Sequence, residues 1–284
     1  MLGHRTTFIT MVIAATARAW ATLAVGQPGG DVRVELTRDY LIVVRGQVGD
    51  RSGLTVVVDT GSLPTLVDSR IGRPFLKSAL KVPVDSLTGT SELESAVLPS
   101  LAVGKFSALE VPVLVTDLSC LEPQFGVRPD VVLGVGVLRG ACFSIDYVRR
   151  TLSFACRDDW RRSRPLDRRS ALLVVDVTID GTPLQLRVDT GSPALVLYDE
   201  AVPEGWRSRV DAEITGYDFS GPVRFRRLIA DVITLGPASW HRRPVYILPA
   251  GVSRQSYDGV LGIRALGMAA VQFDLQRMTL SWND

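Results

Sequence analysis

The tetrapeptide Asp-Thr-Gly-Ser occurs twice in this chain, at residues 59–62 and again at residues 189–192. Each copy directly follows a run of residues that we treat as apolar. Residues 56–58 precede the first copy, and residues 184–188 precede the second. The two aspartates are 130 residues apart (189 − 59 = 130) in a chain of 284 residues. The chain is therefore built to present two equivalent carboxylates, and an internal repeat of this kind limits the folds open to it.

Two further pairs of segments repeat in the same order. Residues 130–134 (Asp-Val-Val-Leu-Gly) match residues 258–262 (Asp-Gly-Val-Leu-Gly), a shift of 258 − 130 = 128. Residues 145–154 match residues 273–282 with the same shift. Three matched blocks in one order indicate a duplicated domain, and the chain length suits two units of roughly 100 to 200 residues each.

The expected division of the chain follows from these blocks and from composition. We expect a signal peptide or N-terminal anchor at 1–21, a first domain at 32–156, a linker at 157–170 and a second domain at 171–284. The linker is charged, lacks periodicity and contains Pro165, which is typical of a solvated connector.

The first residues have a basic start, an apolar middle and a small-residue end, the layout of a secretory signal. Cleavage after Ala19 or Ala21 would remove Arg5 and Arg18 and leave 32 − 2 = 30 basic residues against 30 acidic ones. A neutral mature chain gives no electrostatic reason to expect nucleic acid or an anionic membrane as a partner. The sequence therefore predicts a secreted or periplasmic protein, with an uncleaved membrane anchor as the alternative.

The three cysteines predict one disulfide and no metal site. Cys142 and Cys156 flank a hairpin expected in the first copy, and a turn centred on Arg149 would place them opposite one another. The second copy has no cysteines at the matching positions, so the bond would be structural and local, with Cys120 left as a free, buried thiol. No Cys-x-x-Cys occurs, and His241 is the only histidine outside the leader, so no metal or other cofactor is expected.

Short strands dominate the expected secondary structure. Wholly apolar or alternating runs of about five to eight residues are separated by Gly, Pro, Asp and Ser, which indicates a mostly β chain. The clearest runs are residues 40–44, 54–58, 109–115, 172–179 and 244–248. Short helices are expected after Gly134 and after Gly262.

The repeated tetrapeptide has a specific chemistry. A strand that ends in Asp-Thr-Gly-Ser delivers its aspartate into a tight loop, where glycine lets backbone N–H groups approach the carboxylate and hydroxyls supply hydrogen bonds. If two such loops face each other, carboxyl groups about 3 Å apart cannot both be charged, and the pair shares one proton. A water between them can then attack an amide carbonyl by general acid–base catalysis. The sequence does not tell which aspartate carries the proton.

These residues resemble a known family. The two loops, each followed 132 − 59 = 73 or 260 − 189 = 71 residues later by Val-Leu-Gly, look like those of the aspartic proteases, both pepsin-like and retropepsin-like. The resemblance covers about residues 36–284. It implies an all-β fold of two homologous acid-protease-like β-barrel domains related by pseudo-twofold symmetry, with the active cleft between them and a glycine-ended strand behind each loop.

The resemblance also implies roles for the residues of the two loops. Asp59 and Asp189 would form the catalytic dyad. The threonine hydroxyls would lock the loops together, and the serines would hydrogen-bond the outer carboxylate oxygens. The supporting residues would be Thr60, Gly61, Ser62, Thr190, Gly191 and Ser192.

The chain departs from the pepsin-like pattern at the hairpins that cover the cleft. The family's first-lobe flap carries a tyrosine, but residues 81–98, with a turn near Thr88 and Gly89, contain none. The second copy has Gly216 followed by Tyr217. Two flaps would suit a retropepsin-like arrangement, and Tyr217 could equally be an ordinary exposed loop aromatic.

The sequence thus predicts an aspartic endopeptidase that acts on peptides or proteins. The alternative is a non-catalytic peptide-binding or inhibitor-like module on the same fold. We expect a monomer with a pseudo-dimeric site, and a homodimer that pairs domains between chains is the other arrangement. A serine hydrolase is disfavoured because no Gly-x-Ser-x-Gly elbow exists.

Overall fold

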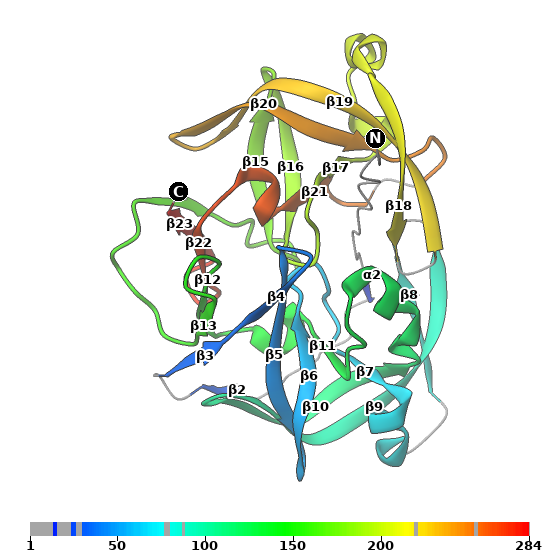
Figure 1. The fold of residues 1–284 in the computed structure, drawn as a ribbon, viewed down its shortest axis with the longest axis vertical. Helices are drawn as coiled ribbons and strands as arrows, with labels where there is room; N and C mark the ends of the chain where they lie inside the picture. Colours follow the sequence, from blue (N-terminus) through cyan, green and yellow to red (C-terminus); the bar gives the residue numbers. More distant parts are fainter. Residues whose placement is uncertain are drawn as a thin grey trace, which may run out of the picture.

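The computed structural model describes residues 30–76, 80–86, 89–218, 221–252 and 255–283, together with the backbone of two short strands at 14–15 and 24–26. The leader expected at residues 1–21 lies outside the described residues except for residues 14–15, and Thr88 also lies outside them. Three β-sheets of ten, six and seven strands make up the fold, connected by short helical turns (Figure 1). The expected all-β architecture is confirmed.

The ten-stranded sheet contains the strand that leads into the first Asp-Thr-Gly-Ser loop, and we refer to this sheet and its connections as the first domain. Its strands are β1 (Ala14–Ala15), β2 (Ala24–Gly26), β4 (Glu35–Thr37), β5 (Leu41–Val48), β6 (Arg51–Val58), β7 (Leu66–Asp68), β8 (Lys81–Asp85), β9 (Thr90–Val103), β10 (Phe106–Thr116) and β11 (Val131–Leu133). Its helical turns are α1 (Ser69–Gly72), η1 (Arg73–Phe75), η2 (Leu118–Leu121), α2 (Glu122–Phe125) and α3 (Val135–Leu138). The helix expected after Gly134 is α3. Within this sheet β5 and β6 form an antiparallel hairpin, and β11 runs parallel to β6.

The seven-stranded sheet contains the strand that ends at Asp189 in the second Asp-Thr-Gly-Ser loop, and we refer to this sheet and its connections as the second domain. Its strands are β15 (Val174–Ile179), β16 (Thr182–Asp189), β17 (Leu195–Leu197), β18 (Ala212–Asp218), β19 (Gly221–Leu235), β20 (Ala238–Ile247) and β21 (Gly259–Gly262). Its 3₁₀ turns are η3 (Asp199–Ala201), η4 (Glu204–Arg209) and η5 (Ile263–Leu266), the last being the turn expected after Gly262. The pairings repeat those of the first domain: β21 is parallel to β16, and β17 to β20, as β11 is to β6 and β7 to β10.

The six-stranded sheet joins the two domains, at the left of Figure 1. Its strands are β3 (Asp31–Arg33), β12 (Cys142–Asp146), β13 (Thr151–Ser153), β14 (Arg162–Pro165), β22 (Ala270–Asp274) and β23 (Thr279–Asn283). The third repeat of the sequence forms the hairpins β12–β13 and β22–β23. Their inner strands β12 and β22 pair antiparallel, with Phe143 opposite Phe273 and their rings stacked at 5.0 Å. The two copies therefore share one sheet.

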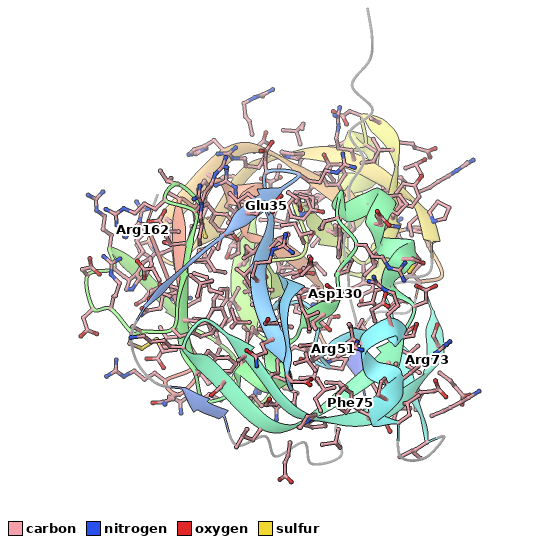
Figure 2. All side chains as sticks on the ribbon, turned by 60° about the horizontal axis from the view of Figure 1, so that its bottom comes forward. Glu35, Arg51, Arg73, Phe75, Asp130 and Arg162 are labelled. Carbon is pink, nitrogen blue, oxygen red and sulfur yellow. A yellow bond between two sulfur atoms is a disulfide. The ribbon has the colours of Figure 1, made fainter. Side chains whose placement is uncertain are left out.

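The segment expected as a solvated connector, residues 157–170, is partly a strand. Its residues Arg162–Pro165 form β14, which pairs antiparallel with β23 at the edge of the six-stranded sheet, and Leu166 is buried. An edge position tolerates both the charges and the proline, because one side of the strand stays open to solvent. Arg162, labelled in Figure 2, is one of these edge residues.

A disulfide joins Cys142, at the start of β12, to Cys156 beyond the end of β13. The burial expected for Cys120 is wrong, because this thiol is exposed. In the 3₁₀ turn η2, Leu118 and Leu121 lie three residues apart and take the buried face, which leaves Cys120 toward solvent. In the described part of the chain, no helix has the length and apolar character needed to cross a bilayer.

Candidate active site

Both Asp-Thr-Gly-Ser segments form the same loop at the end of a buried strand. Asp59 follows β6, and Asp189 is the last residue of β16. The backbone N–H of Gly61 donates to Asp59 Oδ1 at 2.8 Å, and that of Gly191 donates to Asp189 Oδ1 at 2.7 Å. Each loop therefore supplies its own aspartate with a backbone donor two residues later in the chain.

The two loops are held together by threonines. The Thr60 hydroxyl donates to the carbonyl of Val188, and the Thr190 hydroxyl donates to the carbonyl of Val58, both at 3.0 Å. Each hydroxyl oxygen also accepts the backbone N–H of the other threonine, again at 3.0 Å. These four buried hydrogen bonds cross between the domains in a symmetric pattern, and they fix the loops relative to each other.

The loops approach so closely that only glycine fits between the carboxyl groups. A Cβ atom on Gly191 would lie 2.7 Å from Asp59 Oδ1, and a Cβ atom on Gly61 would overlap the carboxyl group of Asp189. The two carboxyl groups are within hydrogen-bonding reach of each other, and both side chains are 0% exposed. The structure thus brings together the two aspartates that the sequence singled out.

Burial and mutual repulsion keep a proton on this pair. Burial raises the pKa of Asp59 well above its usual value, and the charge of Asp189 raises it further. Burial also raises the pKa of Asp189, but Arg187 and the hydrogen bond from Asp59 work against that rise. Two interacting acids of this kind titrate as a pair, so the raised proton affinity belongs to both carboxyl groups together.

The Val-Leu-Gly strands β11 and β21 run behind the two loops. The N–H of Val135 donates to the Ser62 carbonyl at 2.8 Å, and the N–H of Gly262 donates to the Ala194 carbonyl at 2.9 Å. A Cβ atom on Gly134 or on Gly262 would overlap loop carbonyl oxygens. Glycine is required at the end of each strand because the loop backbone packs directly on it.

The Ser62 hydroxyl does not make the hydrogen bond that the resemblance implies. The Ser62 hydroxyl donates to the carbonyl of Pro64 at 2.7 Å, and Asp59 Oδ2 receives no donor from the described residues. The Ser192 hydroxyl donates to the carbonyl of Ala194 at 3.2 Å and accepts its N–H at 3.3 Å. The outer-oxygen hydrogen bond expected from Ser62 is therefore wrong, because its hydroxyl instead closes the turn that leads into Pro64.

Two antiparallel hairpins, β8–β9 and β18–β19, occupy the positions of the expected flaps. In the first hairpin, the carbonyl of Gly89 accepts the N–H of Ser86 at 2.7 Å and closes the turn. In the second, Gly216 is buried and Tyr217 is half-buried on β18, so the alternative of an exposed loop aromatic is wrong.

Tyr217 of β18 makes contacts with the first half of the chain. Its side chain packs against an apolar cluster of the first domain that includes Val84 of β8. Reciprocally, Leu63 of the first loop packs against an apolar cluster of the second domain. The two domains therefore interlock around the dyad.

Comparison with known proteins agrees with this geometry. Residues 44–137 match the family model described as aspartyl protease, a region that includes the first loop and β11. The structure is similar to that of an aspartic proteinase from Irpex lacteus, with a TM-score of 0.57 and 15% sequence identity over 89% of this chain and 96% of that chain. The chain has an aspartic protease fold.

The two matches together support a place in the aspartic protease family. A sequence search of curated proteins gave no match. The family match ends before the second loop, and Asp189 is related to Asp59 by the internal repeat and by the crossed threonine hydrogen bonds.

Sequence reasoning missed one residue of the site. Arg187 stands in the run taken as apolar, yet its Nη2 donates to Asp189 Oδ2 at 3.3 Å, and both side chains are 0% exposed. The signal was an arginine two residues before the motif, because alternate residues of a strand share one face. The matching position in the first copy (187 − 130 = 57) is Val57.

The side chains offer little to a metal ion. In the described ranges, the one group with ligand geometry consists of Cys142, Cys156 and Asp274. Its two cysteines form the disulfide, so their sulfur atoms are not thiolates.

Proposed function

We propose that this protein is an aspartic endopeptidase, in which Asp59 and Asp189 activate a water molecule for attack on a peptide carbonyl. The observation that carries the proposal is the set of crossed threonine hydrogen bonds, which brings two buried carboxyl groups into contact. Simple peptide binding does not need two matched acids that share a proton. Hydrolysis by general acid–base catalysis does.

The proposed reaction needs no covalent intermediate. The ionised carboxylate of the pair takes a proton from the water while the water oxygen forms a bond to the peptide carbonyl carbon. The protonated carboxyl group gives its proton to the carbonyl oxygen. The tetrahedral intermediate then collapses: the carboxyl group that took the proton of the water gives it to the departing amine, and the other carboxylate recovers a proton from a hydroxyl group of the intermediate. Backbone donors from Gly61 and Gly191 hold the two carboxyl groups in place throughout.

The hairpins offer strand edges to an extended peptide. Strand β8 already pairs antiparallel with extended backbone, with Ala14 opposite Asp85 and Ala15 opposite Val84. Strand β18 is the last strand of its sheet. Addition of a peptide to such edges uses main-chain hydrogen bonds and is tolerant of sequence. Because the dyad is buried, some part of the protein around it must move to admit a substrate.

Location and assembly belong to the same proposal. We expect a secreted or periplasmic enzyme that works as a monomer, since both halves of the dyad come from one chain. Fractionation with sequencing of the mature N-terminus tests the location. The size-exclusion mass of the active fraction tests the assembly, and activity confined to a dimer fraction would favour domain pairing between chains.

Peptide cleavage from pH 3 to 7, with and without a statine-type inhibitor, tests the activity. Asp59→Asn and Asp189→Asn should each lower turnover at least about 1,000-fold while leaving the fold intact. Asp176→Asn, which changes an exposed carboxylate outside the dyad, should cleave like wild type. Wild-type rates in both dyad variants would disprove the assignment. Inhibitor binding without any turnover would instead favour the non-catalytic peptide-binding module.

A further inference from the structure

Asp189 has a buried positive charge beside it. Arg187 and Asp189 are i and i+2 on β16, so their side chains share a face of the strand. The guanidinium Nη2 lies 3.3 Å from Asp189 Oδ2, and neither side chain reaches solvent. Arginine is almost never fully buried unless it is paired, and here one partner is a member of the proposed dyad.

Asp59 has no such neighbour at the matching position. Val57 takes the place of Arg187 and is fully buried within the apolar cluster of the first domain. The contacts of the Asp59 carboxylate differ accordingly: Oδ1 accepts the Gly61 N–H, and Oδ2 has no donor among the described residues. Two acids with the same backbone scaffold therefore sit in different electrostatic surroundings.

Arg187 is held so that it stays charged. Its guanidinium lies 5.3 Å from the ring centre of Tyr257, a cation–π distance, and Tyr257 packs against Tyr198 with ring centres 5.9 Å apart. Burial works against the charge, but Tyr257 and Asp189 outweigh it and the pKa of Arg187 is raised. A guanidinium does not lose its proton inside proteins, so the cation is permanent.

We infer that Arg187 assigns the roles within the dyad: Asp189 carries the negative charge and Asp59 carries the proton in the resting enzyme. This inference rests on the proposed protease function. Asp189 would then take the proton of the attacking water, and Asp59 would give its proton to the peptide carbonyl. Arg187 touches neither substrate nor water in this scheme, so it is a positioning residue that acts through Asp189.

The other titratable and charged groups near the dyad do not create this asymmetry. Burial, and after it the charges of Asp189 and Asp59, raise the pKa of Tyr40, so this phenol stays neutral. Burial likewise raises the pKa of Tyr147 and of Tyr198. Arg264 stacks on the ring of Tyr147 at 5.1 Å and donates to the Met268 carbonyl.

A titration that needs no turnover tests the assignment. Carbon-13 labelling of the aspartate carboxyls would follow Asp189 in Asp59→Asn and Asp59 in Asp189→Asn, with the double variant identifying the resonance in each case. Asp189 should titrate at least about 1 pH unit below Asp59, the minimum expected for an acid beside an arginine. Equal values, or the reverse order, would overturn the inference even if the enzyme is a protease.

The pH dependence of kcat/KM gives a second test. Arg187→Met should move the acid limb of the profile upward by about 1 unit or more, because the first ionisation of the pair loses its cation. Arg187→Lys should keep the limb near its wild-type position. Arg128→Met is the control, since it removes an arginine that pairs with Asp68 rather than with the dyad.

The outcomes separate the two proposals. An unchanged acid limb in a folded, active Arg187→Met enzyme would contradict the role of Arg187 and leave the protease assignment intact. Absence of turnover in the wild type would contradict the protease assignment, and the carboxyl titrations would still decide where the proton lies. If Arg187→Met does not fold by circular dichroism, those titrations also decide the question alone.

Discussion

The repeated segments of the two domains make the same backbone hydrogen bonds. In the first, Asp68 N–H donates to the Asp130 carbonyl at 2.9 Å, and in the second, Tyr198 N–H donates to the Asp258 carbonyl at 3.0 Å. Asp130, labelled in Figure 2, also accepts the Thr55 N–H, as Asp258 accepts that of Gln185. Matching hydrogen bonds therefore support the two loops in both domains.

The side chains at matched positions of the repeat differ. Where the first domain has Val57 the second has Arg187, and where the first has Asp68 the second has Tyr198. In the first domain the charged cluster gathers around Asp68, and in the second a cation lies beside the dyad. Duplication has kept the hydrogen bonds that position the acids and left the charges free to diverge. Substitutions at matched positions should therefore have similar effects where they disturb the backbone and different effects where they change a charge.

The largest effect on activity should come from the glycines that occur in both loops. Gly61→Ala and Gly191→Ala each place a methyl group against the opposite carboxyl, and a displacement of about 1 Å in a catalytic group costs on the order of 100-fold in rate. Both variants should lose at least this much kcat/KM. The control Gly205→Ala, where a Cβ atom meets nothing within 4 Å, should keep full activity. Normal activity in either loop variant would show that the loops are farther apart in solution.

The disulfide is present in the first copy of the repeat and has no counterpart in the second. Cys142 and Cys156 are 14 residues apart in sequence, and closing a loop of this size stabilises a fold by about 3 kcal/mol. The double variant Cys142→Ala/Cys156→Ala should lower the free energy of unfolding by about that amount in a urea titration. Wild type kept in reductant should behave like the variant, and a reductant-insensitive wild type would argue against the bond.

Sequence reasoning reached the fold and the dyad because both depend on the repeat. Strand–loop segments that occur twice must pack in the same way, so Asp59 and Asp189 could be paired without coordinates. Residues that occur once gave weaker signals. Arg187 was overlooked because it lies in a run that was interpreted as apolar. The alternation of side chains along a strand predicts which residues share a face, but it does not predict which residues pack against that face. The strand Arg162–Pro165 was missed because its stability comes from pairing with β23 rather than from its own composition.

The dyad aspartates should differ in their effect on stability. Because burial raises the pKa of Asp59, the favourable contribution of its protonated form is fully present below about pH 4 and is lost as pH rises through the folded-state pKa. Asp59→Asn removes that loss and should stabilise the protein at pH 7 but not at pH 4. Asp189→Asn should give no such gain, since it removes the buried carboxylate that pairs with Arg187. Thermal unfolding at pH 4 and pH 7 measures both, and a larger gain for Asp189→Asn would contradict the asymmetry.

The smallest effect should come from the second matched pair, Asp68 and Tyr198. Burial works against ionisation of Asp68, but the N–H and side chain of Arg70, the side chain of Arg128 and the N–H of Leu118 outweigh it, and its pKa is lowered. A lowered pKa gives stability that is present above the unfolded-state value, near 4, and is lost as pH falls. Because the two arginines are 50% and 31% exposed, screening reduces the gain, and Asp68→Asn should cost about 1 kcal/mol at pH 7.

That cost should shrink in high salt, and it should diminish as pH falls below about 4 toward the lowered pKa of the native carboxylate. Tyr198→Phe should show no pH-dependent change between pH 3 and 7, because burial raises the pKa of this phenol and keeps it neutral throughout. Equal pH dependence in the two variants would mean that the domains share their electrostatics as well as their backbone. A salt-sensitive Asp68→Asn beside a salt-insensitive Tyr198→Phe would place the divergence in side-chain charge alone.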